Sequence, residues 1–240
     1  MSSELVNVGP FIGNTRVLDR KECAMNTRRP KVDFGFCEEQ FPAGTHMCLI
    51  YNSEDERERV IAQYIQSGLA QKEKVAYFFV ERTPVQIRTW LHEYGLADLP
   101  VWDEQHFDIQ PAVATYCPHG RFDPGEMLET LKGFHTTATA ENYTGSRVTG
   151  EMAWALQGIP GSERLMEYEA KVNQVIVDYP VNAICQYDAR RFDGATILEC
   201  LKVHPYMIVR GQIVQNPYYL SPDEYLKQSE RGPFGAWVPR

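Results

Sequence analysis

The stretch Thr45-His46-Met47-Cys48-Leu49-Ile50-Tyr51-Asn52-Ser53-Glu54-Asp55-Glu56-Arg57 decides how this 240-residue chain is built. Its apolar run, residues 47–51, predicts a buried strand. Asn52 or Ser53 can cap the helix that follows, and three acids in the first turn suit the helix dipole. Nucleotide-binding α/β proteins place a glycine-rich phosphate loop at such a corner. The turn after Tyr51 therefore decides whether a nucleotide site is present.

That turn lacks the glycines and the lysine of a phosphate loop. The loop needs glycines for close backbone approach, a lysine for the phosphates and a hydroxyl for Mg²⁺. Between Tyr51 and Glu56 there is neither a glycine nor a lysine, and residues 54–56 are all acidic. Carboxylates at a helix N-terminus repel the phosphates that would bind there. We expect no ATP hydrolysis by the phosphate-loop mechanism.

Strands and helices alternate along the rest of the chain. Residues 74–80 form a second apolar run, which suits a central strand covered by helices on both faces. Further strands are expected at residues 106–110, 147–154 and 181–187, and a closing hairpin at residues 206–209 and 212–214. This alternation predicts an α/β fold with a mostly parallel central sheet, helices on both faces and a C-terminal β-hairpin.

The overall composition excludes several classes of protein. A hydrophobic content of 43% suffices for a sizeable core. The net charge of -8 disfavours direct nucleic-acid binding, which needs a basic face. No apolar run is long enough to span a membrane, and the N-terminus has no secretion signal. We therefore expect a cytoplasmic protein with reduced cysteines, none of which forms a Cys-x-x-Cys pair.

Several motifs, in order, resemble the MEDS domain, the methanogen/methylotroph DcmR sensory domain. They are His46-Met47-Cys48-Leu49-Ile50-Tyr51, Gly150-Glu151-Met152-Ala153-Trp154, Gly161-Ser162-Glu163-Arg164-Leu165-Met166-Glu167-Tyr168-Glu169, Ala183-Ile184-Cys185-Gln186-Tyr187-Asp188, His204-Pro205 and Asn216-Pro217-Tyr218-Tyr219. The resemblance covers residues 44–226. It leaves an irregular, basic N-terminal arm at 1–43 and a tail at 227–240. It implies a RecA/KaiC-like fold used as a sensor.

The resemblance also implies a biological role. Domains of this family sense small organic molecules and are joined to a helix-turn-helix or a histidine kinase. Neither is found in this chain, so we expect a free-standing, non-catalytic sensory domain that acts on a separate histidine kinase or transcription regulator. The basic arm is either solvated or a docking segment. A homodimer could use the apolar side chains of the hairpin, namely Met207, Ile208, Ile213 and Val214.

The candidate ligand site lies at the carboxyl ends of the strands, where open α/β sheets bind ligands. Its members follow four predicted strands and combine aromatic with polar groups, as small-molecule sites do: Tyr51, Asn52, Glu81, Arg82, Glu151, Trp154, Tyr187, Asp188 and Arg190. Glu151 resembles the Walker B acid of phosphate-loop proteins. It could bind a ligand, bind Arg190, or simply belong to a structural ion pair.

A metal or haem site is the alternative. His46 and Cys48 are two apart on a strand, so they face the same side. With Cys117, His119 or His204 nearby they could hold zinc, copper or iron. Cys117-Pro118 could also ligate haem. The alternative to a metal site is that His46 is a buried, hydrogen-bonded histidine and Cys48 a core cysteine. Cys185 and Cys200 are also expected in the core.

An enzyme is the third hypothesis. The chain has no Gly-x-Ser-x-Gly elbow, and Ser162 is explained as a helix cap. No spacing supports a triad of Ser162, Asp188 and His204. An unfamiliar catalytic site around Glu151, Tyr187 and Asp188 stays open at this point.

Overall fold

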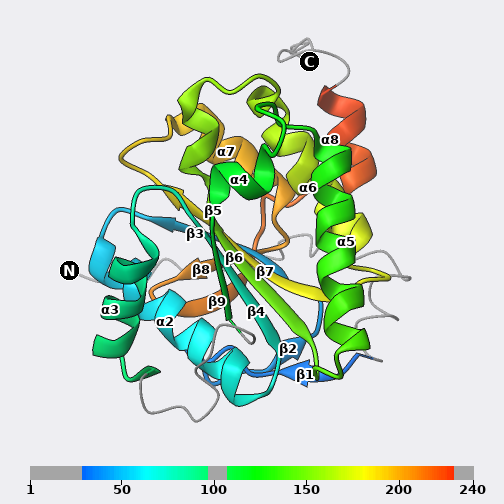
Figure 1. The fold of residues 1–240 in the computed structure, drawn as a ribbon. Coiled ribbons are helices and arrows are strands. Elements are labelled where there is room, and N and C mark those ends of the chain that lie inside the picture. The colour runs from blue at the N-terminus through cyan, green and yellow to red at the C-terminus, as the bar shows by residue number, and fades with distance from the viewer. Residues whose placement is uncertain (1–28, 97–106, 230–240) are drawn as a thin grey trace, which may run out of the picture.

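The computed structural model describes residues 29–96 and 107–229 (Figure 1). A seven-stranded sheet lies at its centre in the order β5-β4-β6-β7-β3-β8-β9. All neighbouring strands are parallel except the last pair, β8 and β9. The strands are β3 (His46–Tyr51), β4 (Lys74–Phe79), β5 (Phe107–Pro111), β6 (Ser146–Glu151), β7 (Val181–Asp188), β8 (Tyr206–Val209) and β9 (Gln212–Gln215).

Helices cover both faces of this sheet (Figure 1). One face carries α2 (Glu54–Ala70) and α3 (Pro84–Glu93). The opposite face carries α4 (Ala112–Tyr116), α5 (Pro124–Ala140), η2 (Met152–Gln157), η3 (Ser162–Arg164), α6 (Leu165–Val175) and α7 (Gly194–Val203). The last helix, α8 (Pro222–Ser229), packs on α6 and α7 through Tyr225. The predicted α/β architecture, parallel sheet and closing hairpin are confirmed.

The alternation of side chains along the strands builds two cores. Met47 and Leu49 of β3 pack toward α2, while Cys48 between them packs toward the opposite helices. All three are almost fully buried. A strand that is buried on both faces needs apolar residues at every position, which explains the continuous run at residues 47–51.

Two predicted boundaries are wrong. The strand predicted at 147–154 ends at Glu151, and a 3₁₀ turn carries Trp154 into the core against Tyr116, with ring centroids 4.9 Å apart. Ser162 does not cap α6, because the η3 turn intervenes and the helix begins at Leu165. Residue 106, placed in the third strand, lies outside the described residues.

Residues 29–43, which belong to the arm predicted to be irregular, contain regular structure. Within its described part, β1 (Lys31–Val32) pairs with β2 (Phe41–Pro42), and Phe34 is fully buried. The Arg29 guanidinium donates to the Val177 carbonyl at 2.5 Å. Residues 29–43 therefore belong to the folded unit. Residues 1–28, which hold most of the basic side chains, lie outside the described part.

The closing hairpin turns through Arg210 and Gly211, both at positive φ, as expected for a two-residue hairpin. Ile208 and Ile213 are buried within this chain, at 4% and 8% exposure. Two of the four apolar side chains considered for a dimer contact are thus buried in the core of this chain. No helix in the described ranges is both long and apolar enough to cross a membrane.

Candidate functional site

Arg57 occupies the corner where the phosphate loop would lie. It comes from the first turn of α2, yet it is only 2% exposed. Its Nη1 donates to the Tyr77 hydroxyl at 3.0 Å and to Gln186 Oε1 at 3.2 Å. Its Nε donates to Glu54 at 2.9 Å. A guanidinium anchored in this way fills the corner from inside the protein.

Glu151, at the carboxyl end of β6, is the acid that Arg57 meets. Arg57 Nη1 lies 3.4 Å from Glu151 Oε1, which also accepts from the Tyr77 hydroxyl. The backbone N–H of Val80 donates to Glu151 Oε2 at 2.9 Å. Of the three alternatives left open for Glu151, the structure shows a structural ion pair, and the partner is Arg57 of α2 instead of Arg190. Both carboxylate oxygens are engaged, so Glu151 belongs to a buried internal ion pair.

The electrostatics of Arg57 follow from these contacts. Burial alone would lower its pKa, but the neighbouring Tyr77 and Glu151 outweigh burial and raise it. The guanidinium is therefore permanently charged. A buried permanent charge must keep its partners, because desolvation would otherwise cost several kcal/mol.

A second layer of charges covers this pair at the surface. Arg190 bridges Glu54 Oε1 at 2.5 Å and Asp188 Oδ2 at 2.7 Å. The hydrogen bond from Arg190 lowers the pKa of Asp188. The Tyr51 ring lies beneath, with the guanidinium carbons of Arg57 and Arg190 at 5.5 and 5.8 Å from its centroid. The structure thus brings Tyr51, Asp188 and Arg190 together.

Three other predicted ligand residues lie around this layer. Asn52 is exposed at the start of the turn. Arg82 is half-buried and forms an ion pair with Glu58 of α2, whereas Glu81 is exposed and pairs with Arg191 at 2.5 Å. Asn52 and Arg82 therefore offer polar groups at the rim.

Trp154 and Tyr187 do not reach this edge. Both are fully buried on the opposite face of the sheet. The Tyr187 hydroxyl donates to Glu169 Oε1 of α6 at 2.8 Å. Because β7 alternates its side chains, Tyr187 faces away from the α2 side where Glu151 lies. The catalytic grouping of Glu151, Tyr187 and Asp188 is therefore not assembled.

A separate polar cluster lies between the sheet and helices α6 and α7. His46 Nε2 is 3.1 Å from Glu169 Oε2, and His204 Nε2 is 3.6 Å from the same oxygen. Cys185 Sγ lies 3.3 Å from Glu169 Oε2. All four side chains are buried. Burial and the neighbouring His46 lower the pKa of His204 to about 4.

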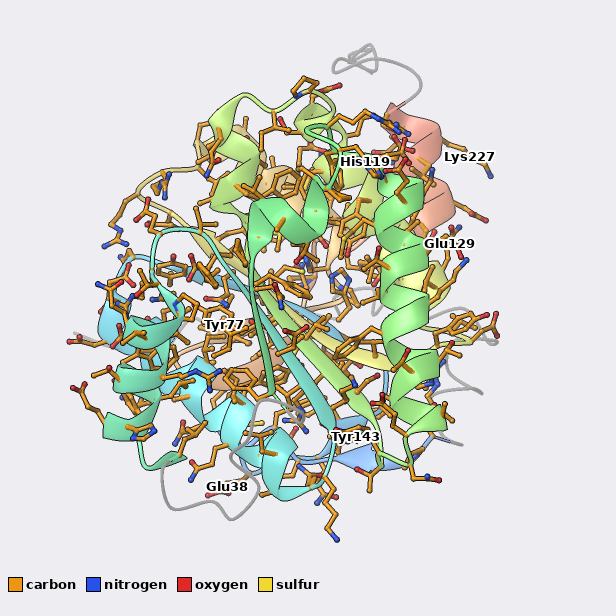
Figure 2. The ribbon with its side chains drawn as sticks, in the orientation of Figure 1. Glu38, Tyr77, His119, Glu129, Tyr143 and Lys227 are labelled. Atoms are coloured by element: carbon orange, nitrogen blue, oxygen red, sulfur yellow. The ribbon has the colours of Figure 1, made fainter. Side chains whose placement is uncertain are left out.

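The metal ligands predicted with His46 and Cys48 are partly wrong. Cys117 is buried at the end of α4, and His119 is exposed beyond it, near the start of α5 (Figure 2). Neither belongs to a His/Cys/carboxylate group among the described residues. His204 does join His46, with ring centroids 4.3 Å apart, because His204 lies between α7 and β8, and β8 pairs with β3.

Sequence periodicity carries a signal for the two charged residues that were missed. Arg57 lies three and four positions before Val60 and Ile61, so it belongs to the apolar face of α2. Glu169 lies four after Leu165 and three before Val172, on the buried face of α6. An ion on an apolar helical face predicts a buried partner. Tyr77, labelled in Figure 2, accepts a hydrogen bond from Arg57, but its uncharged side chain in an apolar strand gives no such signal.

Comparison of the sequence with known proteins identifies its family. Residues 45–205 match the family described as MEDS: MEthanogen/methylotroph, DcmR Sensory domain. The chain belongs to the MEDS family. The transcriptional repressor DcmR of Methylorubrum extorquens (strain DSM 6343 / CIP 106787 / DM4) is 26% identical to this MEDS protein over 160 residues. Those residues are 66% of this chain and 57% of the repressor, so the chain spans little more than half of that relative.

Two solved structures share the fold of this MEDS protein. The KaiC-like protein PH0186 from Pyrococcus horikoshii OT3 has a TM-score of 0.53 and 18% identity, covering 75% of this chain and 80% of its own. The flagellar accessory protein FlaH from Methanocaldococcus jannaschii also has a TM-score of 0.53, at 10% identity, covering 76% and 83%. This member of a family described as sensory domains thus has a RecA/KaiC-like α/β fold.

Proposed function

We propose that this MEDS protein is a non-catalytic sensor that binds a small organic ligand at the carboxyl edge of its sheet. The carrying observation is the buried Arg57–Glu151 pair. In a phosphate-loop protein, this corner holds phosphate and Mg²⁺. Here a guanidinium of the chain itself engages the acid. Glu54 and Asp188 pair with Arg57 and Arg190, so these two arginines are already engaged by carboxylates and not by a phosphate. The retained fold then serves binding instead of hydrolysis.

The ligand would contact the rim formed by Tyr51, Asn52, Arg82 and Arg190. Arg190 joins the end of β7 to the first turn of α2 through Asp188 and Glu54. A ligand that binds one arrangement of this bridge better than another shifts the equilibrium by that difference in affinity. A separate transcription regulator or histidine kinase would bind one of the two conformations and so respond to the ligand. This agrees with the similarity to a transcriptional repressor.

Thermal unfolding of the full chain tests this proposal. The probes are Mg²⁺-ATP, Mg²⁺-ADP and a panel of short-chain alcohols, amines, organic halides and carboxylic acids. We expect at least one organic compound to raise Tm, and the nucleotides to leave it unchanged. Arg190→Ala should abolish the shift, whereas Arg121→Ala, a similarly exposed ion-paired arginine beyond α4, should keep it. Mg²⁺-dependent stabilisation by ATP, or its hydrolysis, would overturn the proposal.

A further inference from the structure

A set of nitrogen, oxygen and sulfur atoms converges beneath the sheet, on the face opposite Arg57. We infer that His46, Glu169, Cys185 and His204 form a binding site for a divalent transition metal of the zinc class. This goes beyond the sensory function proposed above and uses none of the residues at the carboxyl edge. The four side chains come from β3, α6, β7 and the end of α7. The tertiary fold alone therefore brings them together.

The distances match a tetrahedral site. With metal bonds of about 2.0–2.3 Å, neighbouring ligand atoms lie roughly 3.3–3.8 Å apart. Glu169 Oε2 is 3.1 Å from His46 Nε2, 3.3 Å from Cys185 Sγ and 3.6 Å from His204 Nε2. Cys185 Sγ is 3.4 Å from His46 Nε2, and all four ligand atoms lie within 4.8 Å of one another. Adjustments of a few tenths of an ångström suffice along these edges.

The hydrogen bonds of His204 leave its Nε2 lone pair free for a metal. Its Nδ1 lies 2.8 Å from the Cys200 carbonyl, so Nδ1 carries the proton and donates it. Nε2 then presents a lone pair, and no group among the described residues hydrogen-bonds to it. This fully buried nitrogen faces a carboxylate oxygen. Two acceptors face each other there, and a cation between them removes the conflict.

His46 is oriented in the same way. The Asn173 amide nitrogen donates to the Val203 carbonyl at 2.7 Å, which leaves Asn173 Oδ1 to accept from His46 Nδ1 at 3.0 Å. Metal-binding histidines commonly donate the second ring N–H to an oxygen in this manner, which fixes the ring. A proton on His46 Nε2 would satisfy that nitrogen alone. A metal ion satisfies both histidines and the carboxylate together.

The charge and the surroundings suit a closed zinc site. Glu169 and a Cys185 thiolate together neutralise a divalent ion, and metal binding releases the thiol proton to solvent. The other carboxylate oxygen of Glu169 accepts from the Tyr187 hydroxyl at 2.8 Å, which holds the carboxylate in place. Nitrogen and thiolate ligands favour zinc over magnesium or calcium. Four protein ligands and full burial leave no position for a substrate.

A second group, Cys48, Cys200 and His204, shares one histidine with the site. Its geometry is less suitable, because Cys200 Sγ lies 3.6 Å from His204 Nδ1, the nitrogen already bonded to the Cys200 carbonyl. Cys48 Sγ points to the Tyr206 carbonyl at 3.8 Å. We therefore assign Cys185 as the thiolate ligand.

The test is the metal content of the full chain expressed in zinc-supplemented medium, with Co²⁺ as the spectroscopic probe. We expect about one Zn²⁺ per chain and, after exchange, a thiolate-to-Co²⁺ charge-transfer band. Cys185→Ser, a near-isosteric change, should abolish the band and weaken Zn²⁺ binding at least about 10-fold. His204→Gln and Glu169→Gln should weaken Zn²⁺ binding similarly.

Two controls separate the alternatives. Cys117→Ser makes the same change at a buried cysteine outside the cluster, and it should leave the stoichiometry and the band unchanged. Cys200→Ser should also keep both. The assignment is overturned if wild-type protein contains no zinc even after refolding with it, or if Cys200→Ser, not Cys185→Ser, removes the band. Metal content is independent of the Tm shift by organic compounds, so each proposal can fail alone.

Discussion

Replacing Arg57 by Met tests whether the buried guanidinium is the group that closes the corner. Methionine keeps a long unbranched stem but leaves Glu151 without its cation. Unit charges 3.4 Å apart attract by roughly 5 kcal/mol at an effective dielectric of about 20. Removing one partner of a buried pair costs about 3–5 kcal/mol, because the remaining charge stays desolvated. We therefore expect Arg57→Met to lower the free energy of unfolding by about 3–5 kcal/mol.

Urea unfolding followed by circular dichroism measures this loss. Arg82→Met is the matched control, because Arg82 pairs with Glu58 in a half-buried setting and should cost below about 1 kcal/mol. The double variant Arg57→Met/Glu151→Gln removes both charges and should recover part of the loss. If Arg57→Met costs no more than Arg82→Met, the corner is not held by this ion pair.

Two further substitutions test the frame around the site. Gly161→Ala places a Cβ 2.1 Å from the Phe122 carbonyl oxygen at φ +88°, so it should destabilise more than Gly158→Ala, where φ is +70° and nothing lies within 4 Å. Gly158→Ala should cost about 1–2 kcal/mol, and equal melting temperatures for the two variants would contradict the clash. Phe34→Ala should cost about 3–5 kcal/mol in urea unfolding, because Phe34 is fully buried; a cost below about 1 kcal/mol would show that residues 29–43 are not part of the core.

The fold was predictable because its signals are local. The apolar runs at residues 47–51 and 74–80 became β3 and β4, and the Thr83-Pro84 pair became a capping box at the start of α3. The acidic turn after Tyr51 became the start of α2, where Glu54 accepts a hydrogen bond from Arg57. Each of these features depends on residues within a few positions of one another, so sequence alone suffices.

The composition of the sites was harder to predict because it depends on long-range packing. The position at which β7 ends does not determine which face of the sheet the Tyr187 side chain lies on. That face follows from the pairing register of β7 with β3. His46 and Glu169 are separated by 123 residues, and Cys185 and His46 by 139. No spacing rule connects such positions. The strand prediction through Trp154 failed for a related reason, since packing against Tyr116 outweighed β-propensity.

One strand connects the two candidate sites. Cys185 and Gln186 are consecutive on β7, so Cys185 faces the histidines while Gln186 faces Arg57, 3.2 Å from its guanidinium. Any displacement of β7 therefore changes both sets of contacts, and a metal ion held by Cys185 would fix the partner of Arg57. We expect Arg57→Met and Cys185→Ser to be non-additive in the zinc-loaded protein, by about 0.5–3 kcal/mol in unfolding free energy. Additivity within about 0.5 kcal/mol would show that the two faces of the sheet act independently.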